Sequence, residues 1–134
     1  MEYQIIQNPN NPLYGKTYEE VKTILCENGY AIQYVYNQTE ALCKLAVQQD
    51  GYVLQYVHKP TEELYKLAVQ ENGYALQYVY NQTEELCKLA VQQDGTALQY
   101  VYNQTEEICR LAVQQNGYAL RYVSDEYIEL FNVN

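Results

Sequence analysis

Basic residues are scarce in this chain. Only 8 of its 134 residues are Lys or Arg, against 17 Asp and Glu, which gives a formal net charge of −9. A duplex-binding surface needs a basic patch, so we expect no nucleic-acid partner. The sequence also lacks an apolar run near the roughly 20 residues that span a bilayer, and its first residues have no signal-peptide pattern. We therefore expect no membrane partner and a cytoplasmic location.

The chain is also poor in residues that perform chemistry. His58 is the only histidine, and no CxxC or Cys/His spacing, glycine-rich phosphate loop or isolated acid pair is present. Cys43, Cys87 and Cys109 are spaced by multiples of 22 residues. Even the nearest two, Cys87 and Cys109, fall on neighbouring helices about 8–10 Å apart, which is too distant for a disulfide. We interpret these cysteines as small buried residues. The sequence predicts no metal, no cofactor and no enzymatic activity.

What the chain does have is an internal repeat of 22 residues. Residues 72–93 and 94–115 are identical at 18 of 22 positions without a gap. A period in this range is typical of stacked repeat architectures. The predicted organisation is a leader or cap over 1–16, a repeat array over 17–123 (a half repeat 17–27, repeats 28–49, 50–71, 72–93 and 94–115, and a partial copy 116–123), and a C-terminal cap over 124–134.

Each unit reads as a helical hairpin. A Thr followed by acids and an apolar stretch predicts a helix of about 11 residues with an N-cap, as in TEELCKLAVQQ. The following Asn-Gly or Asp-Gly pair predicts a tight turn through left-handed geometry, and YALQYVY predicts a second helix of about seven residues. Neither helix is long enough to be stable alone, so the hairpins must stack. The predicted fold is all-α: a small, right-handed α-solenoid of about ten short helices.

The apolar pattern of the shorter helix separates its faces. Ala31, Ile32 and Val35 define the core direction, and Tyr30 and Gln33 point most nearly away from it. Tyr34 and its equivalents flank the core, where a structural role is favoured over recognition. A tyrosine side chain offers a large contact area and loses few rotamers when it binds a partner. The residues that occupy the positions of Tyr30 and Gln33 in successive copies are therefore the candidate binding residues. They are Tyr30, Gln33, Tyr52, Gln55, Tyr74, Gln77, Gln99, Tyr118 and Arg121.

The unit over residues 85–101 and 107–123 resembles an uncharacterised repeat family, a domain of unknown function that is abundant in giant DNA viruses of amoebae and also found in bacteria. Ala46-Val47, Asn72-Gly73, Ala75-Leu76 and Tyr78-Val79 match its motif. The resemblance implies a helical repeat protein, permits a viral origin and brings no catalytic residues. The short unit is similar also to leucine-rich variant repeats, which implies that the shorter helix is partly 3₁₀.

These observations predict a non-catalytic module that binds a protein partner through its Tyr, Gln and acidic rows. Two alternatives stay open on the sequence alone. One is a small acidic viral or phage inhibitor of a host defence protein, acting in the host cytoplasm. It is motivated by the small size of the chain, by its acidity, which includes Glu pairs at the helix starts, and by its lack of catalytic motifs. The other is a self-assembling protein, since the apolar segment Tyr127–Phe131 either caps the stack or forms a homodimer through the C-terminal end.

Overall fold

The computed structural model describes residues 8–132, and this part of the chain contains helices but no strands. Ten-residue α-helices alternate with six-residue 3₁₀ helices, and a short cap follows. The elements are α1 (Tyr18–Glu27), η2 (Gly29–Tyr34), α2 (Glu40–Gln49), η3 (Gly51–Tyr56), α3 (Glu62–Glu71), η4 (Gly73–Tyr78), α4 (Glu84–Gln93), η5 (Gly95–Tyr100), α5 (Glu106–Gln115), η6 (Gly117–Tyr122), α6 (Asp125–Ile128) and η7 (Glu129–Phe131), where η denotes a 3₁₀ helix.

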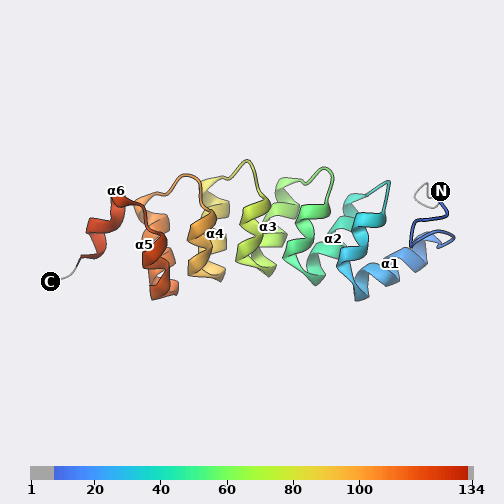
Figure 1. The fold of residues 1–134 in the computed structure, drawn as a ribbon, viewed down its shortest axis with the longest axis horizontal. Coiled ribbons are helices and arrows are strands. Elements are labelled where there is room, and N and C mark those ends of the chain that lie inside the picture. Colours follow the sequence, from blue (N-terminus) through green and yellow to red (C-terminus); the bar gives the residue numbers. More distant parts are fainter. Residues whose placement is uncertain (1–7, 133–134) are drawn as a thin grey trace.

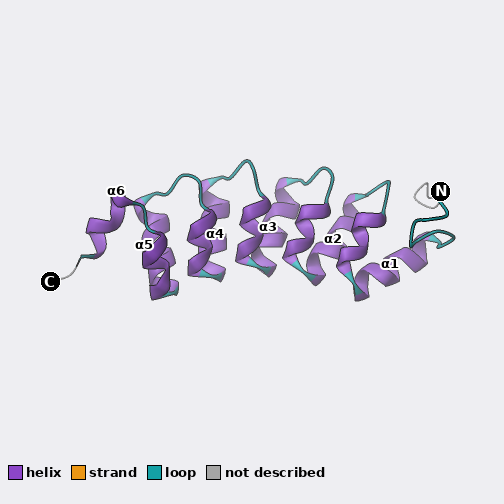
Figure 2. Cartoon of the chain, viewed as in Figure 1, coloured by secondary structure: helices purple, strands orange, loops and turns teal. Residues whose placement is uncertain are grey.

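The helices form two layers. Each of α1 to α4 packs on the next α-helix, each of η2 to η5 packs on the next 3₁₀ helix, and each 3₁₀ helix from η2 to η5 also contacts the α-helices on both sides of it. Figure 1 shows the units side by side in one row, with the inter-repeat linkers along the upper edge and the short turns along the lower edge. Figure 2 shows that loop is confined to these two edges and the ends. The predicted solenoid of helical repeats is confirmed.

Threonine side chains start the α-helices, as the sequence predicts. Thr39, Thr61, Thr83 and Thr105 each accept a hydrogen bond from the backbone N–H three residues later, at 3.1–3.3 Å. Thr17 adds the reciprocal bond from its own N–H to Glu20 Oε1 at 2.8 Å. Hydrogen bonding to Thr17 lowers the pKa of the Glu20 carboxyl. These caps satisfy helix N–H groups that have no partner within the helix.

The shorter helix has the 3₁₀ character that the resemblance to leucine-rich variant repeats implies in part, but it differs from the prediction in length and position. It is a 3₁₀ helix of six residues that begins at the glycine and ends two residues before the predicted end. Asn28 has extended backbone angles, and its side chain accepts the Tyr30 N–H at 3.1 Å, so it acts as an N-cap. The predicted left-handed turn is wrong, because Gly15 is the only residue with positive φ in the described chain.

Close packing between repeats explains the glycine instead, where each repeat is taken as the hairpin of an α-helix and the 3₁₀ helix that follows it. A Cβ atom at Gly29, Gly51, Gly73 or Gly95 would overlap the carbonyl oxygen of the alanine on the following α-helix. These alanines, Ala46, Ala68, Ala90 and Ala112, are fully buried. The glycine and the alanine together let the 3₁₀ helix approach the α-helix backbone of the next repeat. We call this contact the Gly–Ala contact.

The core is a continuous apolar ladder between the layers. Each internal repeat contributes one large buried residue from its α-helix and one from its 3₁₀ helix, such as Leu86 and Leu98, both 0% exposed. At the N-terminal end, Leu13 is buried and Asn11 Nδ2 donates to the Tyr34 carbonyl at 2.8 Å. Residues 1–7 of the expected leader and 133–134 of the expected C-terminal cap lie outside the described residues. Between residues 8 and 132, no helix has the length and apolar content to cross a membrane.

The Gly–Ala contact gives a matched pair of variants. Gly73→Ala places a methyl group against the Ala90 carbonyl, so we expect a loss of about 1–3 kcal/mol in the free energy of unfolding. Gly117 fills the same slot of the last copy, but a Cβ atom there would meet nothing within 4 Å. Gly117→Ala should therefore be neutral or stabilising by up to about 1 kcal/mol. Urea unfolding followed by circular dichroism compares the two, and equal effects would contradict the close approach.

Candidate functional site

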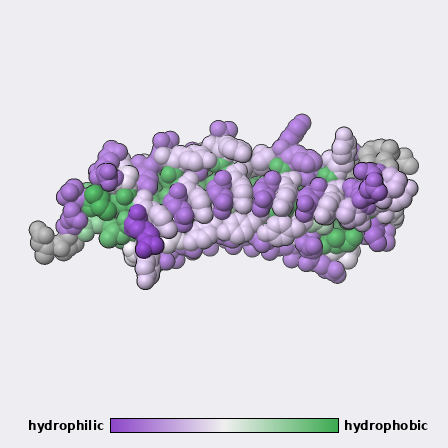
Figure 3. Space-filling model, in the orientation of Figure 1, coloured by the Kyte–Doolittle hydropathy of each residue, from purple (hydrophilic) through white to green (hydrophobic). Residues whose placement is uncertain are grey.

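The nine predicted site residues lie on the 3₁₀ layer, but they are not equally available. Tyr30, Tyr52 and Tyr74 are half-buried, whereas Tyr118 is 73% exposed. Gln33, Gln55, Gln99 and Arg121 are exposed, and Gln77 is half-buried. Figure 3 shows alternating hydrophilic and near-neutral bands along the side of the array that faces the viewer.

The half-buried tyrosines connect neighbouring repeats. Tyr30 packs edge-to-face on Tyr56 at a centroid distance of 5.9 Å, and its hydroxyl donates to Asp50 Oδ2 at 3.0 Å. Burial and this hydrogen bond raise the pKa of Tyr30. The pairs Tyr52–Tyr78 and Tyr74–Tyr100 repeat the ring geometry at 6.1 and 5.6 Å. The expectation that this row points away from the core is wrong for Tyr30 and Tyr74, which pack against it. A 3₁₀ helix turns about 120° per residue instead of 100°, which changes the faces.

The predicted glutamines bind mainly to their own helix. In Gln33, Gln55, Gln77 and Gln99, Nε2 donates to the carbonyl three residues earlier at 3.0–3.1 Å. Gln55 also donates to the Tyr78 hydroxyl at 3.3 Å. The guanidinium of Arg121 lies 5.8 Å from the centroid of the Tyr118 ring. The structure therefore brings the predicted residues onto one face, much of whose hydrogen bonding is already used within the chain.

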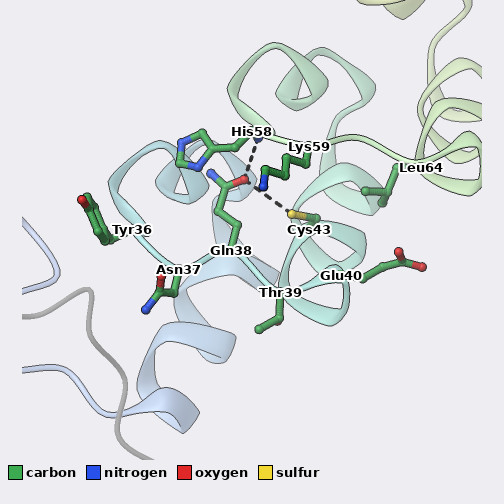
Figure 4. A pocket seen from close by; sticks show the side chains of 9 residues that line it. All are labelled: Tyr36, Asn37, Gln38, Thr39, Glu40, Cys43, His58, Lys59 and Leu64. Atoms are coloured by element: carbon green, nitrogen blue, oxygen red, sulfur yellow. Dashed lines mark hydrogen bonds between the residues drawn. The ribbon is translucent and has the colours of Figure 1, made fainter.

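A different set of glutamines ties the linkers together. Gln38 Nε2 donates to the carbonyl oxygens of Ile32 at 3.1 Å and Tyr56 at 2.9 Å. Gln38 Oε1 accepts the His58 backbone N–H at 2.9 Å and the Cys43 thiol at 3.7 Å (Figure 4). One side chain thus joins its own repeat to the next 3₁₀ helix and the next linker. We call this arrangement the Gln clamp.

The Gln clamp recurs, with one informative exception. Gln82 donates to Tyr100 O at 2.7 Å and accepts from Tyr102 N at 2.9 Å, and Gln104 makes the same pair of contacts with Tyr122 O and Ser124 N. In the remaining linker, Pro60 stands in the glutamine slot and Tyr65 in the cysteine slot. Both members of the Gln–Cys pair are therefore replaced together. This paired change indicates that the cysteine serves the clamp.

Two equivalent pockets lie beside clamped linkers. Their volumes are about 410 and 350 Å³, and their common lining residues are offset by 44 residues, which is two periods. The first is shown in Figure 4, where Cys43 lies amid the lining side chains and Tyr36 lies at their edge. The first pocket is lined by Tyr36, Asn37, Gln38, Thr39, Glu40, Cys43, His58, Lys59 and Leu64, and the second by Tyr80, Asn81, Gln82, Thr83, Glu84, Cys87, Tyr102, Asn103 and Thr105.

Three strongly exposed tyrosines of the array line these pockets. Tyr36 is 76% exposed, Tyr80 is 82% exposed and Tyr102 is 60% exposed. Sequence reasoning does not select them, because it places them inside the shorter helix. That helix ends two residues earlier, so these tyrosines lie in the linkers. The sequence signal that could have identified them is an aromatic residue directly after the last buried valine of each copy, as in Val79-Tyr80.

The pocket thiols are held in their protonated form. Burial raises the pKa of Cys43 and Cys87 to about 11, with a smaller contribution from a nearby glutamate in each case. Burial also raises the pKa of Cys109. A protonated thiol donates to the glutamine and is a poor nucleophile or metal ligand. Within residues 8–132, no cluster of His, Cys, Asp and Glu has the arrangement of a metal site.

The acids at the helix starts are paired with lysines of the preceding repeat. Lys44, Lys66 and Lys88 contact Glu63, Glu85 and Glu107 at 2.8, 3.0 and 2.8 Å. The pKa of Lys44 is raised and that of Glu63 is lowered by this contact. Pairs on the surface contribute little to stability. They do, however, offset the acidic edge on which the inhibitor hypothesis depends.

A family model matches this array twice, over residues 61–104 and 83–128. Together the two matches cover just over half of the chain. The chain belongs to the family described as Domain of unknown function (DUF4116). No curated protein and no solved structure matches it.

The DUF4116 matches follow the repeat seen in the fold. Their starting points differ by 22 residues, which is one period, and the first match begins at the N-cap of α3 and ends within the linker after η5. One DUF4116 match therefore spans two stacked repeats. The membership confirms a repeat family of unknown function.

Loss of one Gln clamp should destabilise the fold. Gln82→Ala leaves the Tyr100 carbonyl and the Tyr102 N–H without this side-chain partner, so we expect a cost of about 1–3 kcal/mol in urea unfolding. Gln99→Ala is the matched control, because Gln99 is exposed and its side chain donates to a carbonyl of its own helix. The control should change stability by less than about 0.5 kcal/mol. A clamp variant as stable as the control would contradict this role.

Thiol reactivity tests the protonated state of the pocket cysteines. Cys26 is exposed, whereas the other three are buried. With a pKa of about 11, roughly one in a thousand pocket thiols is ionised at about pH 8. A disulfide reagent that releases a coloured product on reaction with a thiol should modify only Cys26 rapidly in the folded protein. After denaturation it should modify all four thiols. Rapid modification of Cys43 or Cys87 in the folded protein would show that the pockets do not shield their thiols.

Proposed function

We propose that the chain is a non-catalytic protein-binding module that receives an extended segment of its partner along the linker edge. The linker edge comprises the linkers 35–39, 57–61, 79–83 and 101–105. The observation that carries this proposal is the recurrence of one pocket, with at least one strongly exposed tyrosine in its lining, two repeats further along the array.

The chemistry of the pockets suits a polypeptide. Tyr80 and Tyr102 offer apolar rings with hydroxyl groups, and such residues are enriched at protein interfaces. Asn81 and Asn103 provide carboxamides, which can both donate to and accept from a peptide backbone. A partner side chain would enter between the rings while its backbone is held by the amides.

The spacing of the pockets supports binding at two points. Neighbouring helices pack about 8–10 Å apart, so pockets two repeats apart are separated by about 20 Å. About six residues of extended chain cover this distance at roughly 3.3 Å per residue. Occupation of one pocket would hold the peptide close to the other and raise its effective concentration there.

The two pockets would select different side chains. The first has His58 and Lys59 where the second has Tyr102 and Asn103. A cationic wall favours an acidic or polar partner residue, whereas a second ring favours an apolar one. The order of these residues along the peptide would set its direction on the array.

The remaining expectations have less support. The face of the nine residues predicted from the sequence, which we call the Tyr/Gln face, stays a candidate surface. Three of its tyrosines, Tyr30, Tyr52 and Tyr74, already contact the next repeat. An acidic inhibitor is disfavoured by the lysines that pair with the helix-start acids. A viral source and a host-cytoplasmic location are proposed from the sequence resemblance and composition alone.

Peptide selection tests the linker edge directly. Twelve-residue peptides displayed on phage would be selected on the wild-type protein, and their affinities measured by fluorescence anisotropy. We expect Tyr36→Ala and Tyr80→Ala each to weaken binding by about tenfold, and the double variant by at least about fiftyfold. Gln48→Ala, on the exposed side of α2, is the control and should bind normally.

Two results would contradict the proposal. One is a selection that enriches no peptide. The other is a set of peptides whose affinity falls with Gln55→Ala but not with Tyr80→Ala, which would move the binding site to the Tyr/Gln face.

A further inference from the structure

The last 3₁₀ helix, η6, exposes the surface that every earlier 3₁₀ helix buries. Leu120 is 40% exposed, whereas its equivalents Ile32, Leu54, Leu76 and Leu98 are 0–2% exposed. A Cβ atom at Gly117 would meet nothing within 4 Å, although the four earlier glycines meet the next α-helix there. The open surface of η6 therefore resembles one side of the interface between repeats, with no following α-helix packed on it.

The C-terminal cap covers the other layer. Phe131 lies 5.9 Å from the guanidinium of Arg110 on α5, and Tyr127, Ile128 and Phe131 are half-buried against the core. Leu130 of the same segment is 38% exposed. Figure 3 shows apolar atoms gathered at this end of the array. The cap thus closes the α layer and carries an outward leucine of its own.

Arg121, which lies beside the open surface, and the cap have opposite charge. Arg121 is exposed on η6 and stands in the slot that holds glutamine in all the other copies. The glutamines in this slot are exposed or half-buried inside the array, but Gln55 still reaches the Tyr78 hydroxyl of the next repeat at 3.3 Å. The cap contributes three exposed acids, Asp125, Glu126 and Glu129. Each half therefore combines an exposed leucine with a charge that complements the other half.

We propose that two copies of this chain associate through their C-terminal ends, with the cap of each copy packed on η6 of the other. Leu130 of the partner subunit would cover Leu120, and the acids of the partner's cap would face Arg121. Both contacts are made twice around a two-fold axis, so the assembly closes at two copies. The interface continues the 3₁₀-to-helix packing that the chain already uses at each internal repeat.

The opposite end of the array disfavours an open-ended stack. Glu20 on α1 occupies the slot of the buried residues Leu42, Leu64, Leu86 and Ile108, and it is exposed. Thr23 likewise replaces Leu45. A head-to-tail contact would bury these polar groups against the leucine of η6, which costs free energy. A closed pair through the C-terminal ends avoids that cost.

Sedimentation equilibrium on the full chain tests this arrangement. Over about 5–500 µM, the wild-type mass should rise from 15.7 kDa toward twice that value, and dissociation should become easier in high salt. Leu120→Glu and Arg121→Glu should stay at the monomer mass throughout. Because both side chains are exposed, neither variant should change the melting temperature of the dilute protein by more than about 2 °C.

A control and a rescue locate the interface. Tyr14→Glu changes an exposed tyrosine at the N-terminal end and should leave the dimer intact. Arg121→Glu combined with Glu126→Lys and Glu129→Lys should restore the dimer by exchanging the charges.

Four results would overturn the proposal: a wild-type mass that stays at the monomer value, a dimer unaffected by Leu120→Glu, growth beyond two copies, or failure of the charge exchange to restore association. None of these outcomes depends on peptide binding at the linker edge, so the two proposals fail independently.

Discussion

The close contact between each internal 3₁₀ helix and the backbone of the following α-helix is the constraint on which the rest of this structure depends. It requires a glycine on one side and a small residue on the other, as at Gly73 and Ala90. This approach brings the leucines of successive repeats into one core and places each linker beside the next. The Gln clamp and the tyrosine pairs then form between neighbours that the contact has already aligned. Stability is therefore shared along the array rather than held within a single repeat.

The sequence predicts the period, the N-caps and the stacking because these features depend on local patterns that repeat. The apolar pattern does not distinguish a 3₁₀ helix from a short α-helix, since the two have nearly the same apolar spacing over six residues. Only the resemblance to leucine-rich variant repeats implies some 3₁₀ character. The Asn-Gly pair is misread because the dipeptide favoured in left-handed turns here serves as an N-cap next to a close backbone contact. This change of geometry explains why Tyr74 is half-buried while Tyr80 is exposed.

The candidate site is only partly accessible to sequence reasoning. Gln38 and Cys43 are five residues apart and look like a linker residue and a core residue, and only the folded chain shows that they share a hydrogen bond. Their joint replacement by Pro60 and Tyr65 is visible in the sequence, but its meaning requires the geometry of the linker. The surface is consequently divided. On the 3₁₀ face the tyrosines pair with one another, and on the α face the charged residues form ion pairs. The linker edge and η6 carry the exposed aromatic and apolar groups on which the two proposals rest.

Native-state hydrogen exchange of the backbone amides tests most directly whether packing between repeats holds the 3₁₀ helices in place. The amides of Val79 and Val101 donate to carbonyls within their own 3₁₀ turns, which would exchange quickly in an isolated peptide. The account predicts that they exchange nearly as slowly as the amides of α3 and α4, and that Val123, at the end of η6, exchanges much faster in dilute protein. Rapid exchange at Val79 and Val101 beside protected α-helices would show that the α layer is stable without the 3₁₀ layer and would contradict the account.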